Sequence, residues 1–168
     1  MKDLINIFIV DDNKVFTLAL KADIENAFNE IPMMIHTFET GEKCMQAFKE
    51  ITPEFVILDY HLDNKYAEAA NGIQVLDWIK KENNATNVVI LTVDDNIDIA
   101  LKSFQHGASD YVVKTNTQFR KINYSLINLF KMMEAKSYAK RYKQLVVGIL
   151  LCATLIVGGV IAIQIFSH

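Results

Sequence analysis

The sequence of 168 residues is poor in the residues that break or cross-link a chain, with two prolines, six glycines and two cysteines. So few cysteines exclude a small fold held together by several disulfides, and so little proline and glycine excludes a collagen-like or linker-rich chain. We predict that Cys44 and Cys152 are small, buried, apolar residues that do not pair with each other. Residues 1–144 are enough for one ordinary domain with its own core.

Charge is missing from the last part of the sequence, where no Asp, Glu, Lys or Arg follows Lys143. Residues 145–166 contain only Thr154 and Gln164 as polar side chains, and as a helix they would reach about 33 Å. A buried core helix is the alternative, but such helices are usually shorter and carry a polar edge. We therefore predict a transmembrane helix at 145–166. Its small residues at one-turn spacing, such as Gly148 and Cys152, would let two spans pack as a homodimer.

The net charge of −3 hides an uneven distribution. Residues 129–143 contain five bases and one acid, a net charge of +4, whereas residues 1–128 contain 12 bases and 19 acids, a net charge of −7. We interpret residues 131–144 as a basic helical stalk beside the span. Bases at this place favour the cytoplasmic side, so the expectation is a single-pass protein of the inner (cytoplasmic) membrane with its main domain in the cytoplasm. An acidic domain predicts no nucleic-acid partner.

Short apolar runs alternate with helix-length segments between residues 5 and 130. Five strands are expected at 5–10, 33–38, 55–59, 88–92 and 110–114. Nearly continuous apolar runs are typical of strands covered on both faces, whereas the run 33–38 alternates and should lie near an edge. The pattern predicts an α/β fold with right-handed crossovers and a parallel sheet.

Five helices should fill the intervals between and after these strands. They are expected from Asn13 to before Pro32, at 41–50, from Gly72, at 95–106, and from the sequence "TNTQ" at 115–118, which has the spacing of a capping box. For the first helix we predict an inner side made of Val15, Leu18, Ala22 and Phe28. The third should turn Ile73, Leu76 and either Trp78 or Ile79 inward. The last helix contains no glycine or proline before Gly148, so it is free to continue through the stalk into the predicted span.

Polar residues end four of the five predicted strands. Because the carboxyl ends of parallel strands meet at one edge of the sheet, this edge is where ligands bind in such folds. The residues expected there are Asp11, Asp12, Asp59, Thr92 and Lys114. Each alone has an ordinary structural interpretation, as a helix cap or a surface charge. Three converging carboxylates repel one another, however, and this favours a hard divalent cation such as Mg²⁺.

Five fragments, in this order, resemble the receiver domain of bacterial response regulators. They are "FIVDDNK", "FVILDYHL", "NGIQVL", "VVILTVDD" and "GASDYVVK", and the resemblance covers about residues 4–130. It implies a flavodoxin-like sheet of five parallel strands in the order 2-1-3-4-5, with helices on both faces. It also implies a two-component pathway in which a histidine kinase or phosphotransfer protein donates a phosphoryl group.

The resemblance also implies roles for individual residues. Asp59 would be the phospho-acceptor, and Asp11, Asp12, Asp59 and the backbone carbonyl of His61 would hold Mg²⁺. Lys114 would pair with phosphorylated Asp59, and Thr92 would turn its hydroxyl toward a phosphoryl oxygen. Tyr111 is a candidate switch residue, with a half-buried strand tyrosine as the alternative.

The sequence departs from the family's pattern at two places. Lys114 is followed by Thr115 instead of proline, so no cis X-Pro peptide is expected there. Twelve residues separate Asp59 from Gly72, more than is usual for the family. This loop could tune dephosphorylation or kinase choice through His61, Asp63 or Lys65, or it could be a tolerated surface insertion.

The leading hypothesis is a membrane-tethered receiver, residues 1–130, that signals through protein contacts with an unknown downstream partner. Its output surface would be the face made by the fourth helix, the fifth strand and the fifth helix. It would not be an enzyme beyond its own phosphoryl transfer and dephosphorylation. One alternative is an unphosphorylated membrane adaptor, which has no need of all five site residues. Another is an aspartyl-phosphate hydrolase, which would have a second Asp at the position of His61.

Overall fold

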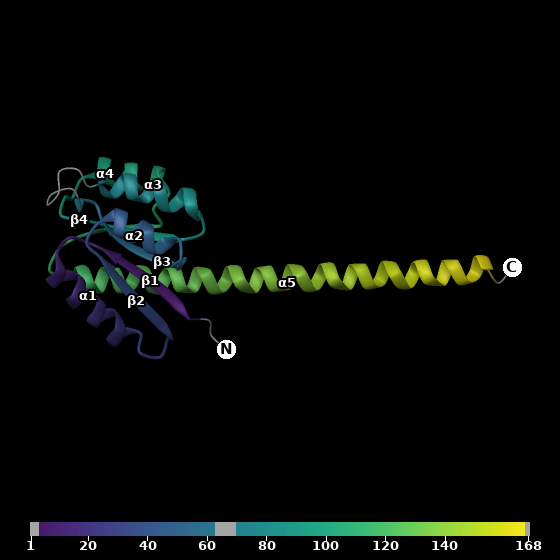
Figure 1. Ribbon diagram of the computed structural model, residues 1–168. Coiled ribbons are helices and arrows are strands. Elements are labelled where there is room, and N and C mark those ends of the chain that lie inside the picture. The colour runs from purple at the N-terminus through teal and green to yellow at the C-terminus, as the bar shows by residue number, and fades with distance from the viewer. Residues whose placement is uncertain (1–3, 63–69, 167–168) are drawn as a thin grey trace. The chain divides into compact units, whose positions relative to one another are not determined.

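The structure of the protein is a computed structural model that describes residues 4–62 and 70–166, with side chains up to residue 154 (Figure 1). Strands and helices alternate strictly along the described chain. The elements are β1 (Ile5–Val10), α1 (Lys14–Ala27), β2 (Met33–Phe38), α2 (Gly41–Phe48), β3 (Phe55–Asp59), α3 (Gly72–Glu82), β4 (Asn87–Thr92), α4 (Ile97–Gln105), β5 (Asp110–Val113) and α5 (Gln118–Phe166). The predicted positions of all ten elements are therefore confirmed to within a few residues.

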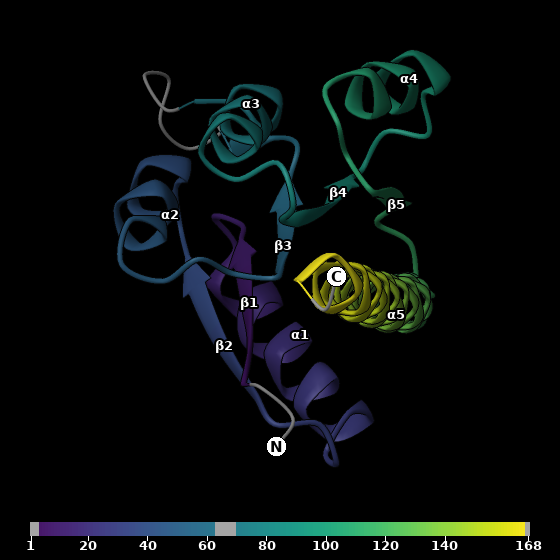
Figure 2. The same cartoon turned by 90° about the vertical axis from the view of Figure 1, so that its right-hand side faces the viewer.

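The five strands form one parallel sheet in the order β2-β1-β3-β4-β5. This is the predicted flavodoxin-like order, and it places the alternating strand β2 at an edge, as predicted. The central strands β1, β3 and β4 are buried along almost their whole length, because helices cover both faces of the sheet. Figure 2 shows α1 and the first turns of α5 on one face, and α2, α3 and α4 on the other.

Helix α1 buries a different face from the one that we predicted. Its buried residues are Thr17, Leu20 and Ile24, at spacings of three and four. Val15 and Leu18 are instead 78% and 64% exposed, and Ala22 is exposed too, whereas Phe28, directly after the helix, is buried as predicted. The prediction followed the apolar side chains of Val15 and Leu18, but the buried face is a neighbouring one that has Thr17 in place of an apolar residue.

Helix α3 begins where its sequence predicts. Asn71 accepts a hydrogen bond from the Gln74 N–H, and the Gln74 side chain accepts one from the Asn71 N–H, which completes a capping box. Ile79 is buried and Trp78 is partly exposed, which resolves the alternative left by the sequence. The predicted capping box at 115–118 is wrong, because the Gln118 N–H donates to the backbone carbonyl of Thr115 and not to its side chain.

Gly72 permits close packing of α3 against the strand that ends at Asp59. A Cβ at this position would lie 2.5 Å from the Asp59 carbonyl oxygen and 2.7 Å from the Tyr60 Cα. Both are backbone atoms, so neither can rotate away. The Gly72 N–H also donates to the Tyr60 carbonyl at 2.9 Å, which holds the two backbones together.

We expect Gly72→Ala to lower the free energy of unfolding by about 2–3 kcal/mol, as in other overpacked sites. Urea denaturation measures this change. Gly148→Ala is the matched control, because a Cβ at Gly148 meets nothing within 4 Å. Equal urea midpoints for the two variants would contradict the close approach at Gly72.

The chain divides into two compact units, residues 1–126 and 127–168. Helix α5 is described as one helix from Gln118 to Phe166, in agreement with the lack of helix breakers up to Gly148. Cys44 is buried, as predicted, and burial raises the pKa of its thiol to about 12. Cys152 is exposed, which contradicts its predicted burial; that prediction depended on lipid around the helix.

Among the residues that the structure describes, no helix is both long enough and apolar enough to cross a membrane. The transmembrane helix predicted at 145–166 is therefore not confirmed. The side chains of its second half, from residue 155, lie outside those described. In its first half, the large apolar side chains from Leu145 to Leu151 are exposed.

Candidate functional site

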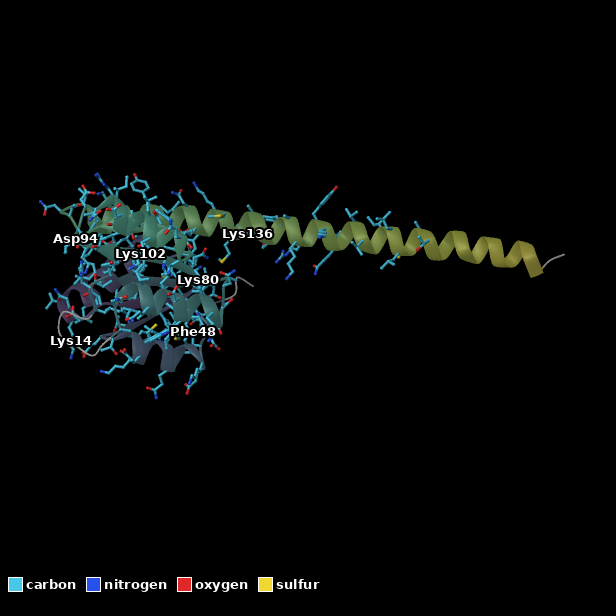
Figure 3. All side chains as sticks on the ribbon, turned by 90° about the horizontal axis from the view of Figure 1, so that it is seen from above. Lys14, Phe48, Lys80, Asp94, Lys102 and Lys136 are labelled. Atoms are coloured by element: carbon cyan, nitrogen blue, oxygen red, sulfur yellow. The ribbon has the colours of Figure 1, made fainter. Side chains whose placement is uncertain are left out.

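The sheet brings the predicted site residues to the carboxyl ends of its strands. Asp11 follows β1 directly, Asp59 and Thr92 end β3 and β4, and Lys114 follows β5. The strand register aligns these ends, since Asp59 lies beside Leu91 and Thr92 beside Val113. Figure 3 shows Lys14 and Asp94, which follow β1 and β4, at one end of the sheet, away from Phe48 and Lys80.

Three carboxylates converge at this edge. One oxygen each from Asp11, Asp12 and Asp59 lies within 4.8 Å of the other two. Asp11 is 1% exposed and Asp59 is 5% exposed, so two of the three carboxylates are almost completely removed from water. Asp11 is further fixed by the Asn13 N–H, which donates to its Oδ1 at 2.9 Å. The convergence that the sequence predicted is therefore present in the structure.

Lys114 supplies the positive charge within this cluster. Its Nζ donates to Asp11 Oδ2 at 2.7 Å and lies 2.9 Å from Asp59 Oδ1. Its side chain is only 16% exposed. Lys114 thus bridges two carboxylates, whereas the sequence predicted only a pairing with Asp59. Its N–H also donates to the Thr92 carbonyl, which fixes the backbone where β5 ends.

The pKa shifts at the site follow from burial and from these charges. Burial raises the pKa of Asp11 above its ordinary range, and repulsion by Asp59 adds to this increase, while Lys114 opposes it. Burial alone would lower the pKa of Lys114, but the charges of Asp59 and Asp11 outweigh burial and raise it. The cluster therefore has an excess of negative charge that one ammonium does not neutralise.

The donor set fits a hard divalent cation. Although Asp59 Oδ1 lies near the Lys114 ammonium, this buried atom accepts no well-directed hydrogen bond. An incompletely satisfied carboxylate oxygen beside two further carboxylates is the ligand chemistry that Mg²⁺ prefers. In the described chain these residues are also the one group of three potential ligand side chains close enough for a metal ion.

Thr92 and Tyr111 are joined through Asp94. The Asp94 N–H donates to Thr92 Oγ1 at 3.1 Å, and the Tyr111 hydroxyl donates to the Asp94 carbonyl at 2.7 Å. A tyrosine hydroxyl is protonated near neutral pH, and burial raises the pKa of Tyr111 further above its ordinary value. A movement of Thr92 would therefore be transmitted to the tyrosine through one short turn.

His61 lies at the start of the long loop and contacts the same turn. Its Nε2 donates to Asp94 Oδ2 at 2.7 Å, which links the ends of β3 and β4 across the site. At the far end of the loop, the Ala70 N–H donates to Glu42 Oε1. Burial alone would raise the pKa of Glu42, but this hydrogen bond and others to its carboxylate lower it. Asp63 and Lys65 lie outside the described residues.

Sequence analysis missed several residues that contact the predicted site. Asp94 was part of a quoted fragment, but nothing in the sequence indicated that it joins His61, Thr92 and Tyr111. Phe16 and Phe119 pack together beside Lys114, with ring centroids 5.7 Å apart. No cis peptide occurs in the described part of the chain, as expected for a lysine followed by Thr115.

Known proteins share this fold. A family model described as "Response regulator receiver domain" matches residues 7–123. The DNA-binding transcriptional regulator NtrC of Klebsiella pneumoniae is 27% identical over 107 residues, 64% of this chain and 21% of that protein. The probable C4-dicarboxylate response regulator DctR of Bacillus subtilis is 29% identical over 108 residues, 64% of this chain and 41% of its own.

A solved structure extends the comparison to three dimensions. The signal receiver domain of a putative Luxo repressor protein from Vibrio parahaemolyticus has a TM-score of 0.68 and 25% identity. That match covers 80% of this chain and 95% of the other. By contrast, this chain spans about a fifth of the length of the NtrC relatives, so the similarity concerns one domain of those proteins.

Proposed function

Because this chain belongs to the response regulator receiver domain family, we propose that it accepts a phosphoryl group on Asp59 in a two-component pathway. The observation that carries this proposal is the Lys114 ammonium, which lies between the buried carboxylates of Asp11 and Asp59. Asp59 presents a nucleophilic oxygen, and Lys114 is placed to balance the charge that a phosphoryl group would add. The roles of the individual residues below are part of the proposal.

In the proposed reaction, an Asp59 carboxylate oxygen attacks the phosphorus atom of the donor. With phosphohistidine as donor, the P–N bond breaks and its electron pair returns to the imidazole. With acetyl phosphate, the P–O bond to the acetyl group breaks and acetate leaves. Asp59 becomes an acyl phosphate in both cases, and Lys114 pairs with the added phosphoryl oxygens.

Mg²⁺ would be held by Asp11, Asp12, Asp59 and the backbone carbonyl of His61. When bound, it supplies positive charge that offsets the negative charge of the phosphoryl oxygens. Asp11 and Asp12 would serve as its acidic ligands, and its positive charge would offset the repulsion between Asp11 and Asp59.

Mg²⁺ should raise the melting temperature of the wild type. A free Mg²⁺ concentration of ten times its Kd stabilises the folded state by about 1.4 kcal/mol. This corresponds to an increase in melting temperature of about 3–6 °C for a domain of this size. Asp11→Asn should melt no lower than the wild type in EDTA, because it removes a buried charge but keeps the oxygen that accepts from Asn13. It should also lose the response to Mg²⁺.

The matched control is Asp98→Asn, which changes an exposed aspartate of α4. Differential scanning calorimetry with and without Mg²⁺ measures both effects. A full Mg²⁺ response in Asp11→Asn would contradict the proposed ligand set.

Thr92 and Tyr111 are proposed as the switch that reports phosphorylation. The Thr92 hydroxyl would donate to a phosphoryl oxygen, and the shift of its turn would disturb the hydrogen bond between Tyr111 and Asp94. Tyr111 lies on β5, and the neighbouring helix α4 exposes Ile97, Leu101 and Phe104. These apolar side chains support the face made by α4, β5 and α5 as the surface that a downstream protein contacts.

The proposed partners are a histidine kinase or phosphotransfer protein as donor and a downstream protein as target. The chain would catalyse only its own phosphorylation and dephosphorylation, so we do not propose an enzyme acting on a separate substrate. DNA binding is stated in the name of the NtrC relatives, of which this chain spans only about a fifth. The acidic main domain supports a target other than nucleic acid.

Attachment to the inner membrane through 145–166, with the receiver in the cytoplasm, is a separate proposal. It is supported by the uncharged sequence of that segment and by the bases before it. Vesicle flotation of the full chain tests it, with Leu155→Arg/Ile156→Arg as the variant, since each arginine costs about 2.5–3.5 kcal/mol at the centre of a span. Equal flotation of the two proteins, or none by the wild type, would overturn it.

Intact mass spectrometry after incubation with Mg²⁺ and acetyl phosphate tests the proposed function. The wild type should gain the mass of one phosphoryl group, and excess EDTA should prevent most of this gain. An unmodified wild type would contradict the proposal and would leave the unphosphorylated adaptor as the better interpretation of the fold.

A further inference from the structure

The ammonium of Lys114 contacts an aromatic ring as well as two carboxylates. Its Nζ lies over the ring of Phe16, 5.0 Å from the centroid. Phe16 belongs to the first turns of α1, and the ring of Phe119, at the start of α5, packs against it at an interplanar angle of 52°. Two helices that are distant in the sequence thus meet beside the Lys114 ammonium.

A lysine side chain needs such support, because its four-carbon stem is flexible and its ammonium is a point charge without a preferred direction. Asp11 and Asp59 attract the Lys114 ammonium from the side of the carboxylate cluster. The Phe16 ring supplies a further attraction, since the negative face of an aromatic ring attracts a cation. Together these contacts define one position for Nζ, between the two aspartates.

We propose that Phe16 is a positioning residue for the phosphorylation site, and that Phe119 holds its ring in place. The aromatic face keeps the Lys114 ammonium within reach of both Asp11 and Asp59 before the phosphoryl group arrives. This inference rests on the proposed function, because the position of Lys114 matters only if Asp59 is phosphorylated. Phe16 itself touches neither the carboxylates nor the transferred group in the proposed reaction.

Substitutions can separate the aromatic face from simple packing. Phe16→Leu keeps an apolar side chain of similar size but removes the negative ring face, whereas Phe16→Tyr keeps that face. Phe119→Leu leaves the Phe16 side chain itself unchanged but removes its aromatic neighbour. Tyr138→Leu is the matched control, because Tyr138 is an exposed aromatic residue of α5 outside this cluster.

The test compares the rates at which these proteins are phosphorylated by acetyl phosphate with Mg²⁺. Phe16→Leu should be about two- to fivefold slower than the wild type, which is the size expected for a partly exposed cation–π contact. Phe119→Leu should also be phosphorylated more slowly than the wild type. Phe16→Tyr and Tyr138→Leu should react at the wild-type rate, and all four should melt near the wild-type temperature.

NMR of the lysine side chains gives a second readout that loss of packing alone would not produce. The ring current of Phe16 should shift the ε-methylene protons of Lys114, and this shift should disappear in Phe16→Leu and return in Phe16→Tyr. A wild-type rate in Phe16→Leu, or a rate in Phe16→Tyr as low as in Phe16→Leu, would overturn the inference alone. A wild type that is not phosphorylated would overturn the proposed function, and this inference with it.

Discussion

Asp59→Asn is expected to gain no phosphoryl group from acetyl phosphate under conditions in which the wild type is fully phosphorylated, a loss of at least about a hundredfold in rate. The amide has nearly the shape of the carboxylate but lacks the anionic oxygen that attacks phosphorus. Asp59 is buried beside Lys114, and Lys114 keeps Asp11 as a partner when Asp59 is neutral. The variant should therefore fold.

Intact mass spectrometry over a time course measures this loss, and circular dichroism checks the fold. Asp110→Asn is the matched control, because Asp110 begins β5 at the opposite end of the sheet and uses its Oδ1 to accept from the Tyr111 N–H. An asparagine keeps this hydrogen bond. Phosphorylation of Asp59→Asn to the wild-type extent would mean that another side chain is the acceptor.

Lys114→Met should have the second largest effect, on both stability and rate. Removing one partner of a buried ion pair leaves the other charge uncompensated, which costs about 3–5 kcal/mol in fully buried pairs. We expect about 3 kcal/mol here, because Lys114 retains some exposure. The phosphorylation rate should fall by about 10²-fold, the loss typical for one charge-stabilising donor.

The pH dependence of this destabilisation has a defined sign. The folded state raises the pKa of Lys114, so in the wild type its contribution is fully present below the ordinary lysine pKa of about 10.4 and is lost as pH rises through the raised value. The folded state also raises the pKa of Asp11. Protonation of Asp11 as pH falls removes a repelling charge, so the defect of Lys114→Met should shrink in acid.

Urea denaturation at several pH values measures both trends. Lys102→Met serves as the control, since Lys102 is an exposed lysine of α4. A Lys114→Met variant as stable as this control at pH 7 would show that the ammonium does not balance the carboxylates.

The fold and the composition of the site followed from patterns with a simple physical cause. Nearly continuous apolar runs predicted β1, β3 and β4, because strands covered on both faces must be apolar throughout, and alternation predicted β2 at an edge. The strand ends then predicted that Asp11, Asp59, Thr92 and Lys114 would meet. Parallel strands force this result, whatever the details of packing.

Side-chain contacts between distant segments could not be predicted in the same way. His61 and Asp94 are 33 residues apart, and their contact depends on the lengths of two loops and on side-chain rotamers. The buried face of α1 was mispredicted because Val15 and Leu18 are apolar but exposed. A buried side chain is usually apolar, but an apolar side chain can also stay on the surface at modest cost. Hydrophobicity alone therefore does not identify the buried face of a helix.

Locating the phosphoryl group within the chain tests the central claim most directly. The wild type, phosphorylated with acetyl phosphate and Mg²⁺, would be digested in acid and its peptides sequenced by tandem mass spectrometry, with a hydroxylamine-treated sample in parallel. We predict that the group lies on Asp59 and that hydroxylamine, which cleaves acyl phosphates, removes it. A phosphoryl group on a serine, threonine or histidine, or one that resists hydroxylamine, would contradict the proposed site.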